Sequence, residues 1–208
     1  MGKKIIFHLL VQLLMIKLSL MRQVQSDSSN LAGYDDCLIH NKAYLNEYLY
    51  SPTLKLNENN RTMNVSINDV YLLPLDKVND FGQLRWSLIE ITNQTGYFYL
   101  KNSHNDQYLC IAFNMAAFIN SRGKIRKLKL VTSNDYFYNC IWNVKKVGPS
   151  SAYTITSMLF DESLNAISYF FRKRIDYKRE VVLMNNKYSY SNKAVWIIDC
   201  KRGSYLWI

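Results

Sequence analysis

Short apolar runs separated by polar turns make up most of the chain after residue 26. The clearest series covers residues 86–91, 97–101 and 107–113, with Asn, Asp, Gly and Ser in the breaks. Runs of five to seven residues that are rich in β-branched and aromatic side chains are typical of strands rather than helices. The pattern therefore predicts an all-β protein.

Comparable runs continue to the end of the chain. We expect further strands at residues 48–50, 54–56, 63–67, 70–73, 127–132, 142–147, 153–157, 164–171, 180–184 and 196–200. One segment, residues 114–119, has a helical composition through Met115-Ala-Ala-Phe118. We expect a short turn of helix there, inserted in a β-hairpin.

A tryptophan motif recurs about every fifty residues. Trp86-Ser-Leu, Trp142-Asn-Val and Trp196-Ile-Ile are separated by steps of 56 and 54 residues, and each is followed 9 to 11 residues later by a second strand-like run. A fainter copy starts at Cys37 and reaches Tyr48. Internal repeats indicate units that bury their core against one another. About four strands in each of three units predict a β-trefoil, a six-stranded barrel capped by three hairpins. A β-sandwich also has short strands and frequent turns, but the repeat argues against it.

The repeats resemble those of ricin-B-type β-trefoils over roughly residues 37–208. In that family, a Trp-x-[Leu/Ile] strand precedes a strand ending in Asn or Ser and a Leu-Cys strand. Here Trp86-Ser-Leu88, residues 99–102 and Tyr108-Leu-Cys110 follow this order. The family's Gln-x-Trp is replaced, because Leu84, Cys140 and Ala194 stand two residues before the tryptophans. The sugar-binding set of Asp, aromatic and Asn is also missing, so the resemblance does not imply a galactose lectin.

Four cysteines form an even set, and export would favour two disulfides in any of three pairings. The resemblance implies Cys110–Cys140, because repeats of this family often carry a bridge between two strands of one unit. It also implies Cys37–Cys200, because the first and last strands are antiparallel neighbours in a closed trefoil. A zinc site is not expected, because the chain has no Cys-x-x-Cys.

The first 26 residues predict a secretory signal. Lys3 and Lys4 precede a mostly apolar stretch, and residues 24–26 offer a cleavage site. One domain then covers residues 27–208, a length that can bury a sizeable core. Three sequons in polar stretches, at Asn60, Asn64 and Asn93, favour glycosylation of an exported protein.

The net charge of +10 would fall to +6 on removal of the signal, so the domain stays basic. Two basic runs, at residues 122–129 and 172–179, belong to hairpin caps of the trefoil, which lie at one end of the barrel. Together they predict a patch that binds an extracellular polyanion or glycan, such as a glycosaminoglycan; secretion makes nucleic acid a less accessible partner. The residues of this predicted patch are Lys124, Arg126, Lys127, Lys129, Arg172, Lys173, Arg174, Lys178 and Arg179.

Three alternatives stay open at this point. The charges can simply solvate two loops. The fold is also shared by receptor ligands similar to fibroblast growth factors and interleukin-type cytokines, and by protease inhibitors similar to the soybean Kunitz type. An inhibitor would offer Arg122-Gly or Lys173-Arg174 as bait. The sequence leaves the oligomeric state open.

Catalytic constellations are scarce. His40 and His104 are the histidines outside the predicted signal, and neither has a nucleophile at a familiar spacing. Phosphate loops and metal-ligand clusters are absent from the sequence. We therefore expect a binding protein rather than an enzyme, without a cofactor or a metal.

Overall fold

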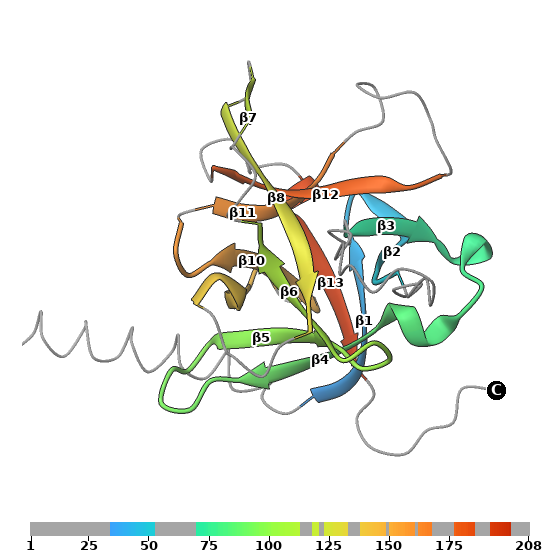
Figure 1. Ribbon diagram of the computed structural model, residues 1–208, viewed down its shortest axis with the longest axis horizontal. Coiled ribbons are helices and arrows are strands. Elements are labelled where there is room, and N and C mark those ends of the chain that lie inside the picture. The colour runs from blue at the N-terminus through green and yellow to red at the C-terminus, as the bar shows by residue number, and fades with distance from the viewer. Residues whose placement is uncertain are drawn as a thin grey trace, which may run out of the picture.

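The computed structural model describes the barrel, its caps and most of their connections (Figure 1). The described residues are 34–52, 70–112, 118–120, 123–132, 138–148, 150–160, 162–167, 177–185 and 192–200. The predicted signal, Asn60, Asn64 and the strands expected at 54–56 and 63–67 lie outside them. Among the described residues, no helix is long and apolar enough to cross a membrane.

Six strands close the barrel. Each pairs antiparallel with two others, in the circular order β1–β4–β5–β9–β10–β13 and back to β1. Closure leaves no free edge on these strands. They are β1 (Tyr34–Asn41), β4 (Arg85–Glu90), β5 (Tyr97–Asn102), β9 (Ile141–Lys146), β10 (Ala152–Ser157) and β13 (Val195–Cys200).

Three hairpins cap the barrel, as the repeat predicts. In addition, β12 pairs with β3 at Arg179 and Glu180 and with β8 from Val182 to Met184, which joins the hairpins to one another. The hairpins are β2 (Tyr44–Tyr50) with β3 (Tyr71–Pro74), β6 (Gln107–Ile111) with β8 (Gly123–Val131), and β11 (Glu162–Ala166) with β12 (Arg179–Asn185). The protein is therefore a β-trefoil.

The unit boundaries differ from the expected ones. Trp86, Trp142 and Trp196 stand opposite Asn102, Ser157 and Asn41, which makes β1 the equivalent of β5 and β10. The copy at Cys37 is thus the second strand of a unit, not its first. Unit A is β4, β5, β6 and β8, and unit B is β9 to β12. Unit C starts with β13 and continues with β1, β2 and β3, so both ends of the described chain build it.

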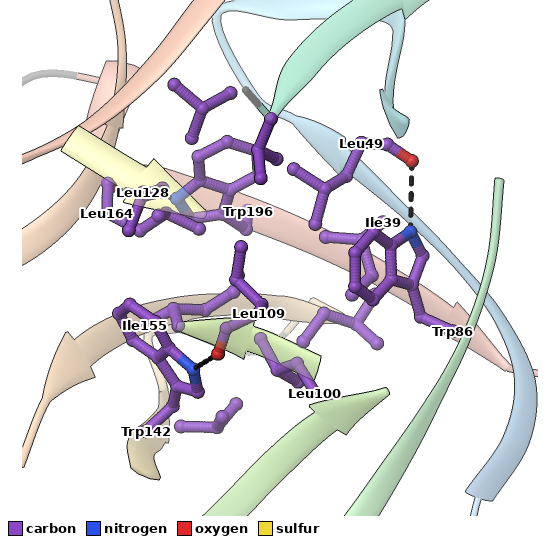
Figure 2. Packing of buried hydrophobic residues seen from close by; sticks show 14 of the residues in the cluster. Ile39, Leu49, Trp86, Leu100, Leu109, Leu128, Trp142, Ile155, Leu164 and Trp196 are labelled. Atoms are coloured by element: carbon purple, nitrogen blue, oxygen red, sulfur yellow. Dashed lines mark hydrogen bonds between the residues drawn. The ribbon is translucent and has the colours of Figure 1, made fainter. Parts of the chain in front are cut away.

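The tryptophans fix the core. All three have no exposed surface, and their indole N–H groups donate to equivalent leucine carbonyls. Figure 2 shows these bonds for Trp86 and Trp142. Trp86 donates to Leu49 at 3.0 Å, Trp142 to Leu109 at 2.8 Å and Trp196 to Leu164 at 3.0 Å. A buried indole needs such a partner, and its ring supplies the largest apolar area of any side chain. The interpretation of the tryptophans as core anchors is confirmed.

A short 3₁₀ helix leads into each tryptophan strand. These helices are η3 (Phe81–Leu84), η4 (Tyr138–Cys140) and η7 (Asn192–Ala194), and a further one, η2 (Leu75–Lys77), follows β3. Asn41 and Asn102 stabilise two of these entries, because each side-chain amide donates to two carbonyls of the incoming segment.

The helical turn expected at 114–119 is wrong for its last two residues. They belong to strand β7 (Phe118–Asn120), which pairs antiparallel with β8, with Ile119 opposite Lys124 and Asn120 opposite Gly123. Residues 113–117 are outside the described part. Pairing with β8 and the strand preference of Phe and Ile outweigh the local Met-Ala-Ala composition. In Figure 1, β7 and the adjoining part of β8 extend away from the other strands.

Both expected disulfides are present. Cys37–Cys200 joins β1 to β13 at directly opposite positions, and Cys110–Cys140 joins β6 to η4. The first bridge links the two halves of unit C, and the second links unit A to the start of unit B.

Candidate functional site

The two basic runs meet on neighbouring strands of the cap. Residues 123–129 of the first run lie in β8, and the second run ends with Lys178 and with Arg179, which opens β12. The strands pair antiparallel, with Arg126 opposite Leu183 and Lys127 opposite Val182. Cap strands distant in sequence thus bring the ends of the two runs together.

Alternation along β8 divides its cations between two faces. Leu128 and Leu130 are buried, whereas Lys127 and Lys129 are partly exposed on the opposite face. Arg126 shares the parity of the two leucines and therefore points to the inner side. Lys124 lies in β8 opposite Ile119 of β7.

Arg126 is engaged inside the cap. Its Nε donates to Glu162 Oε2 at 2.7 Å, and its guanidinium carbon lies 3.7 Å from the centroid of the Phe160 ring. The side chains of Arg126 and Glu162 are only 17% and 7% exposed. A cation held by a carboxylate and an aromatic face adds little to the outer potential.

Arg179 is engaged in the same way, and more completely. Its Nε and Nη2 donate to the two carboxylate oxygens of Glu47 at 2.5 and 2.8 Å, and its Nη1 donates to Ile167 O at 3.0 Å. The Tyr44 ring centroid lies 3.3 Å from its guanidinium carbon, and the residue is 5% exposed. Such bidentate geometry is the strong form of the Arg–carboxylate pair. Arg126 and Arg179 therefore hold units together.

Lys178 supplies the next cation along the cap. It is exposed, and its ammonium lies 5.6 Å from the centroid of the Tyr71 ring on β3. Val182, opposite Lys127, is four residues further along the same segment, roughly 13 Å at strand rise. Lys77 of η2, which sequence analysis missed, lies 5.1 Å from the Tyr177 ring, but Asp76 matches its charge at 3.0 Å. Its hydrogen bond to Asp76 raises the pKa of Lys77.

Several predicted residues are outside the described part. Three basic residues of the predicted patch are among them: Arg172, Lys173 and Arg174. Both candidate inhibitor bonds, at Arg122 and at Lys173–Arg174, also fall outside the described residues. Of the three sequons, Asn93 is described. It is exposed in the turn between β4 and β5, with a positive φ of 66°.

The histidines each face one carboxylate. His40 Nε2 lies 3.3 Å from Asp199 Oδ2, and His104 Nε2 lies 3.0 Å from Asp80 Oδ2. The second contact fixes a loop, because Asp80 Oδ1 accepts from Gly82 N and the imidazole covers that glycine so closely that a Cβ would clash with it. The described residues contain no group of three or more potential metal ligands.

No protein-family model and no curated protein matches this chain. Solved structures resemble it at low identity. The designed threefold-symmetric protein ThreeFoil is 14% identical, with 78% of this chain and 96% of that chain covered at a TM-score of 0.53. A salivary protein from Culex, of a cysteine- and tryptophan-rich family, is 15% identical, with coverages of 81% and 96% and a TM-score of 0.53.

A lectin is among these structures. The Polyporus squamosus lectin, bound to a human-type influenza-binding epitope that contains Neu5Ac, is 13% identical at a TM-score of 0.58. The match covers 80% of this chain and 49% of the lectin chain. At such identities the similarity establishes the β-trefoil fold alone.

Proposed function

We propose that this protein is a secreted binding protein whose basic cap recognises an anionic or carbohydrate extracellular ligand, such as a glycosaminoglycan. One observation carries the proposal: Lys127 and Lys129 lie on the outer face of β8, beside the strand that continues the second basic run. Ammonium groups that project from one strand face suit repeated sulfate or carboxylate groups along a polysaccharide.

The neighbouring arginines sharpen the electrostatic argument. Arg126 and Arg179 are matched by Glu162 and Glu47, so the outward cations are the lysines of β8 and Lys178, which precedes β12. Lysine carries a compact, hydrated charge and lacks arginine's rigid fork. Lysines therefore recognise a high density of negative charge rather than one anion of fixed geometry. A ligand with many similar anionic groups fits this surface better than a single phosphate.

The compartment is part of the proposal. Two disulfides are expected for an extracellular protein, and an exposed sequon at Asn93 and a signal-like start agree with export. The trefoil lectin of known structure holds a glycan that contains Neu5Ac, an acidic sugar. That likeness supports carbohydrate recognition by the fold and leaves the ligand of this chain to experiment.

Retention on a heparin column tests the proposal. The protein lacking residues 1–26 should bind the column. It should elute only at high salt, because salt ions must screen many charge contacts before the protein is released. Lys127→Ala/Lys129→Ala should elute clearly earlier. Lys145→Ala/Lys146→Ala is the matched control, because it removes two lysines from barrel strand β9 and should elute close to the wild type.

Two results would contradict the basic cap. One is passage of the wild-type protein through the column at physiological salt. The other is an equal shift for both double variants, which would mean that net charge alone governs retention. Thermal unfolding of each variant checks that the fold is intact.

A further inference from the structure

A pair of tyrosines lies on the outer face of unit A. Tyr99 of β5 and Tyr108 of β6 meet edge to face, with ring centroids 6.0 Å apart and an interplanar angle of 81°. Their strand neighbours Leu100 and Leu109 are fully buried, so the tyrosines project to the opposite side of the sheet. Both tyrosines are partly exposed.

Lys101 places its ammonium group over the Tyr108 ring. The two residues stand opposite each other in β5 and β6, and the ammonium lies 5.5 Å from the ring centroid. The same ammonium pairs with Asp106 at 2.5 Å, and that hydrogen bond raises the pKa of Lys101. The contact keeps the ring in one orientation, and such preorganisation lowers the entropic cost of binding.

The tyrosine pair adjoins the lysines of β8. Strand β6 pairs with β8, with Tyr108 opposite Val131 and Cys110 opposite Lys129. Tyr108 and Lys129 are therefore diagonal neighbours on one face, roughly 7–8 Å apart. Cys110, which the bridge to Cys140 ties to η4, has the parity of Tyr108 and stands directly opposite Lys129. An aromatic and a cationic element thus share one continuous surface.

We propose that Tyr99 and Tyr108 form an aromatic subsite for a sugar ring of an acidic saccharide whose anionic groups bind Lys127 and Lys129. The C–H face of a pyranose packs on an aromatic ring, and the phenol hydroxyls can exchange hydrogen bonds with sugar hydroxyls. Lys101 is matched by Asp106, so it positions the ring and leaves charge recognition to β8. The inference rests on the proposed function and narrows its ligand from any polyanion to a saccharide.

Two probes separate sugar recognition from charge recognition. Binding of a heparin-derived hexasaccharide and of polyvinyl sulfate, which has no sugar rings, is measured by calorimetry for the protein lacking residues 1–26. Tyr108→Ala should weaken the hexasaccharide by about tenfold or more and change polyvinyl sulfate binding less than about twofold. Lys127→Ala/Lys129→Ala should weaken both probes.

Matched variants guard against a folding artefact. Tyr108→Phe keeps the ring and should retain most of the hexasaccharide affinity. Tyr48→Ala removes another partly exposed tyrosine, from β2, and should bind both probes as the wild type does. Circular dichroism in the near ultraviolet verifies that each variant is folded.

The outcomes are distinguishable. If Tyr108→Ala binds the hexasaccharide normally while the lysine variant loses it, the aromatic subsite is refuted and the basic cap stands. If Tyr108→Ala weakens both probes equally, the tyrosine has no saccharide preference and the inference is refuted. If the wild-type protein binds neither probe, the proposed function fails and the subsite fails with it.

Discussion

Two of the three junctions between units are closed by an arginine–glutamate pair, and the third by neutral amide and hydroxyl groups. Glu47, Gln107 and Glu162 are equivalent, because each stands two residues before the leucine whose carbonyl accepts the indole N–H. Arg179 of unit B reaches Glu47 of unit C, and Arg126 of unit A reaches Glu162 of unit B. At the junction of units C and A, Ser51 Oγ donates to Gln107 Oε1 at 3.3 Å.

The aromatic residues at the junctions also differ between the charged and the neutral type. Tyr44 and Phe160 stack on the two guanidinium groups, whereas the equivalent residue at the neutral junction is Asn105. Asn105 donates from Nδ2 to both oxygens of Ser51 at 3.0 Å. Equivalent junctions of the trefoil can therefore be charged or neutral, provided that the polar residue at the Glu47 position and its neighbours change together. A charge needs its counter-charge and its aromatic cover, and a neutral residue needs amide partners.

Removal of one glutamate should show the largest difference between junction types. Glu47→Ala leaves the guanidinium of Arg179 buried without its carboxylate, and we expect a loss of about 3–5 kcal/mol in the free energy of unfolding. Urea unfolding with both disulfides intact measures it. Asp36→Asn is the control, because it removes the charge at a residue with a φ of 65°, which asparagine tolerates, and the Asp36–Arg85 pair, 38% and 29% exposed, should contribute less than about 1 kcal/mol.

The double variant Glu47→Leu/Arg179→Met completes the test. Replacement of a buried ion pair by apolar side chains is often close to neutral, so much of the loss from Glu47→Ala should be recovered. A loss below about 1 kcal/mol for Glu47→Ala itself would show that the charged junction behaves like an exposed pair.

The sequence indicates that Arg126 and Arg179 lie on the buried faces of their strands, although a count of charges does not show it. Arg126 has the parity of Leu128 and Leu130, and Arg179 has the parity of Val181 and Leu183. Strand alternation therefore places both on the buried face, where a cation needs a carboxylate. Grouping them with their lysine neighbours as one basic run overlooks this alternation. Which carboxylate pairs with each arginine depends on contacts 36 and 132 residues away, which no local pattern encodes.

The tryptophan repeat predicted the barrel for a physical reason. Each buried tryptophan needs a carbonyl acceptor for its indole N–H, and each unit supplies one at an equivalent leucine. The spacing between tryptophans therefore equals the length of a unit. The same spacing could not reveal that unit C is assembled from both ends of the described chain. Cys37–Ile39 reads like any strand, and its true equivalence with residues 98–100 follows only from the pairing of β1 with β13. The helical turn expected at 114–119 was wrong for Phe118 and Ile119, because their pairing with β8 is a tertiary effect.

A carboxylate placed at the neutral junction tests the comparison from the other side. Gln107 is 2% exposed, so Gln107→Glu introduces a buried acid where the structure supplies hydroxyl and amide partners. We expect a loss of about 1–3 kcal/mol at pH 7. Gln94→Glu, in an exposed turn, is the control and should stay within about 0.5 kcal/mol of the wild type.

The pH dependence of this variant has a definite sign. Burial raises the pKa of the new carboxyl, so the folded state holds its proton at a pH where the unfolded state has lost it. The deficit relative to wild type should therefore be small near pH 4 and should grow as the pH rises. A deficit that is the same at pH 4 and pH 7 would mean that shape, not charge, excludes the acid.

The smallest expected effect concerns Tyr50, which precedes Ser51 at the neutral junction. Burial, and secondly the negative charge of Asp80, raise the pKa of Tyr50 above its ordinary value near 10. The folded state therefore keeps this proton at a pH where the unfolded state releases it, so stability present below pH 10 falls as the pH rises further. Tyr50→Phe should make that alkaline fall shallower, by less than about 1 kcal/mol at a partly exposed site.

Other groups contribute with the same sign, so the test depends on differences between variants. Burial raises the pKa of Tyr153, and a hydrogen bond to Asp106 raises the pKa of Lys101. Unfolding curves from pH 8 to pH 11 for wild type, Tyr50→Phe, Tyr153→Phe and the double variant separate the contributions. Asp80→Asn should reduce the part that belongs to Tyr50 and leave the Tyr153 part unchanged. If the free energy of unfolding falls equally with pH for wild type and Tyr50→Phe, ionisation of Tyr50 does not affect stability. The hydroxyl and amide contacts alone would then determine the stability of the neutral junction.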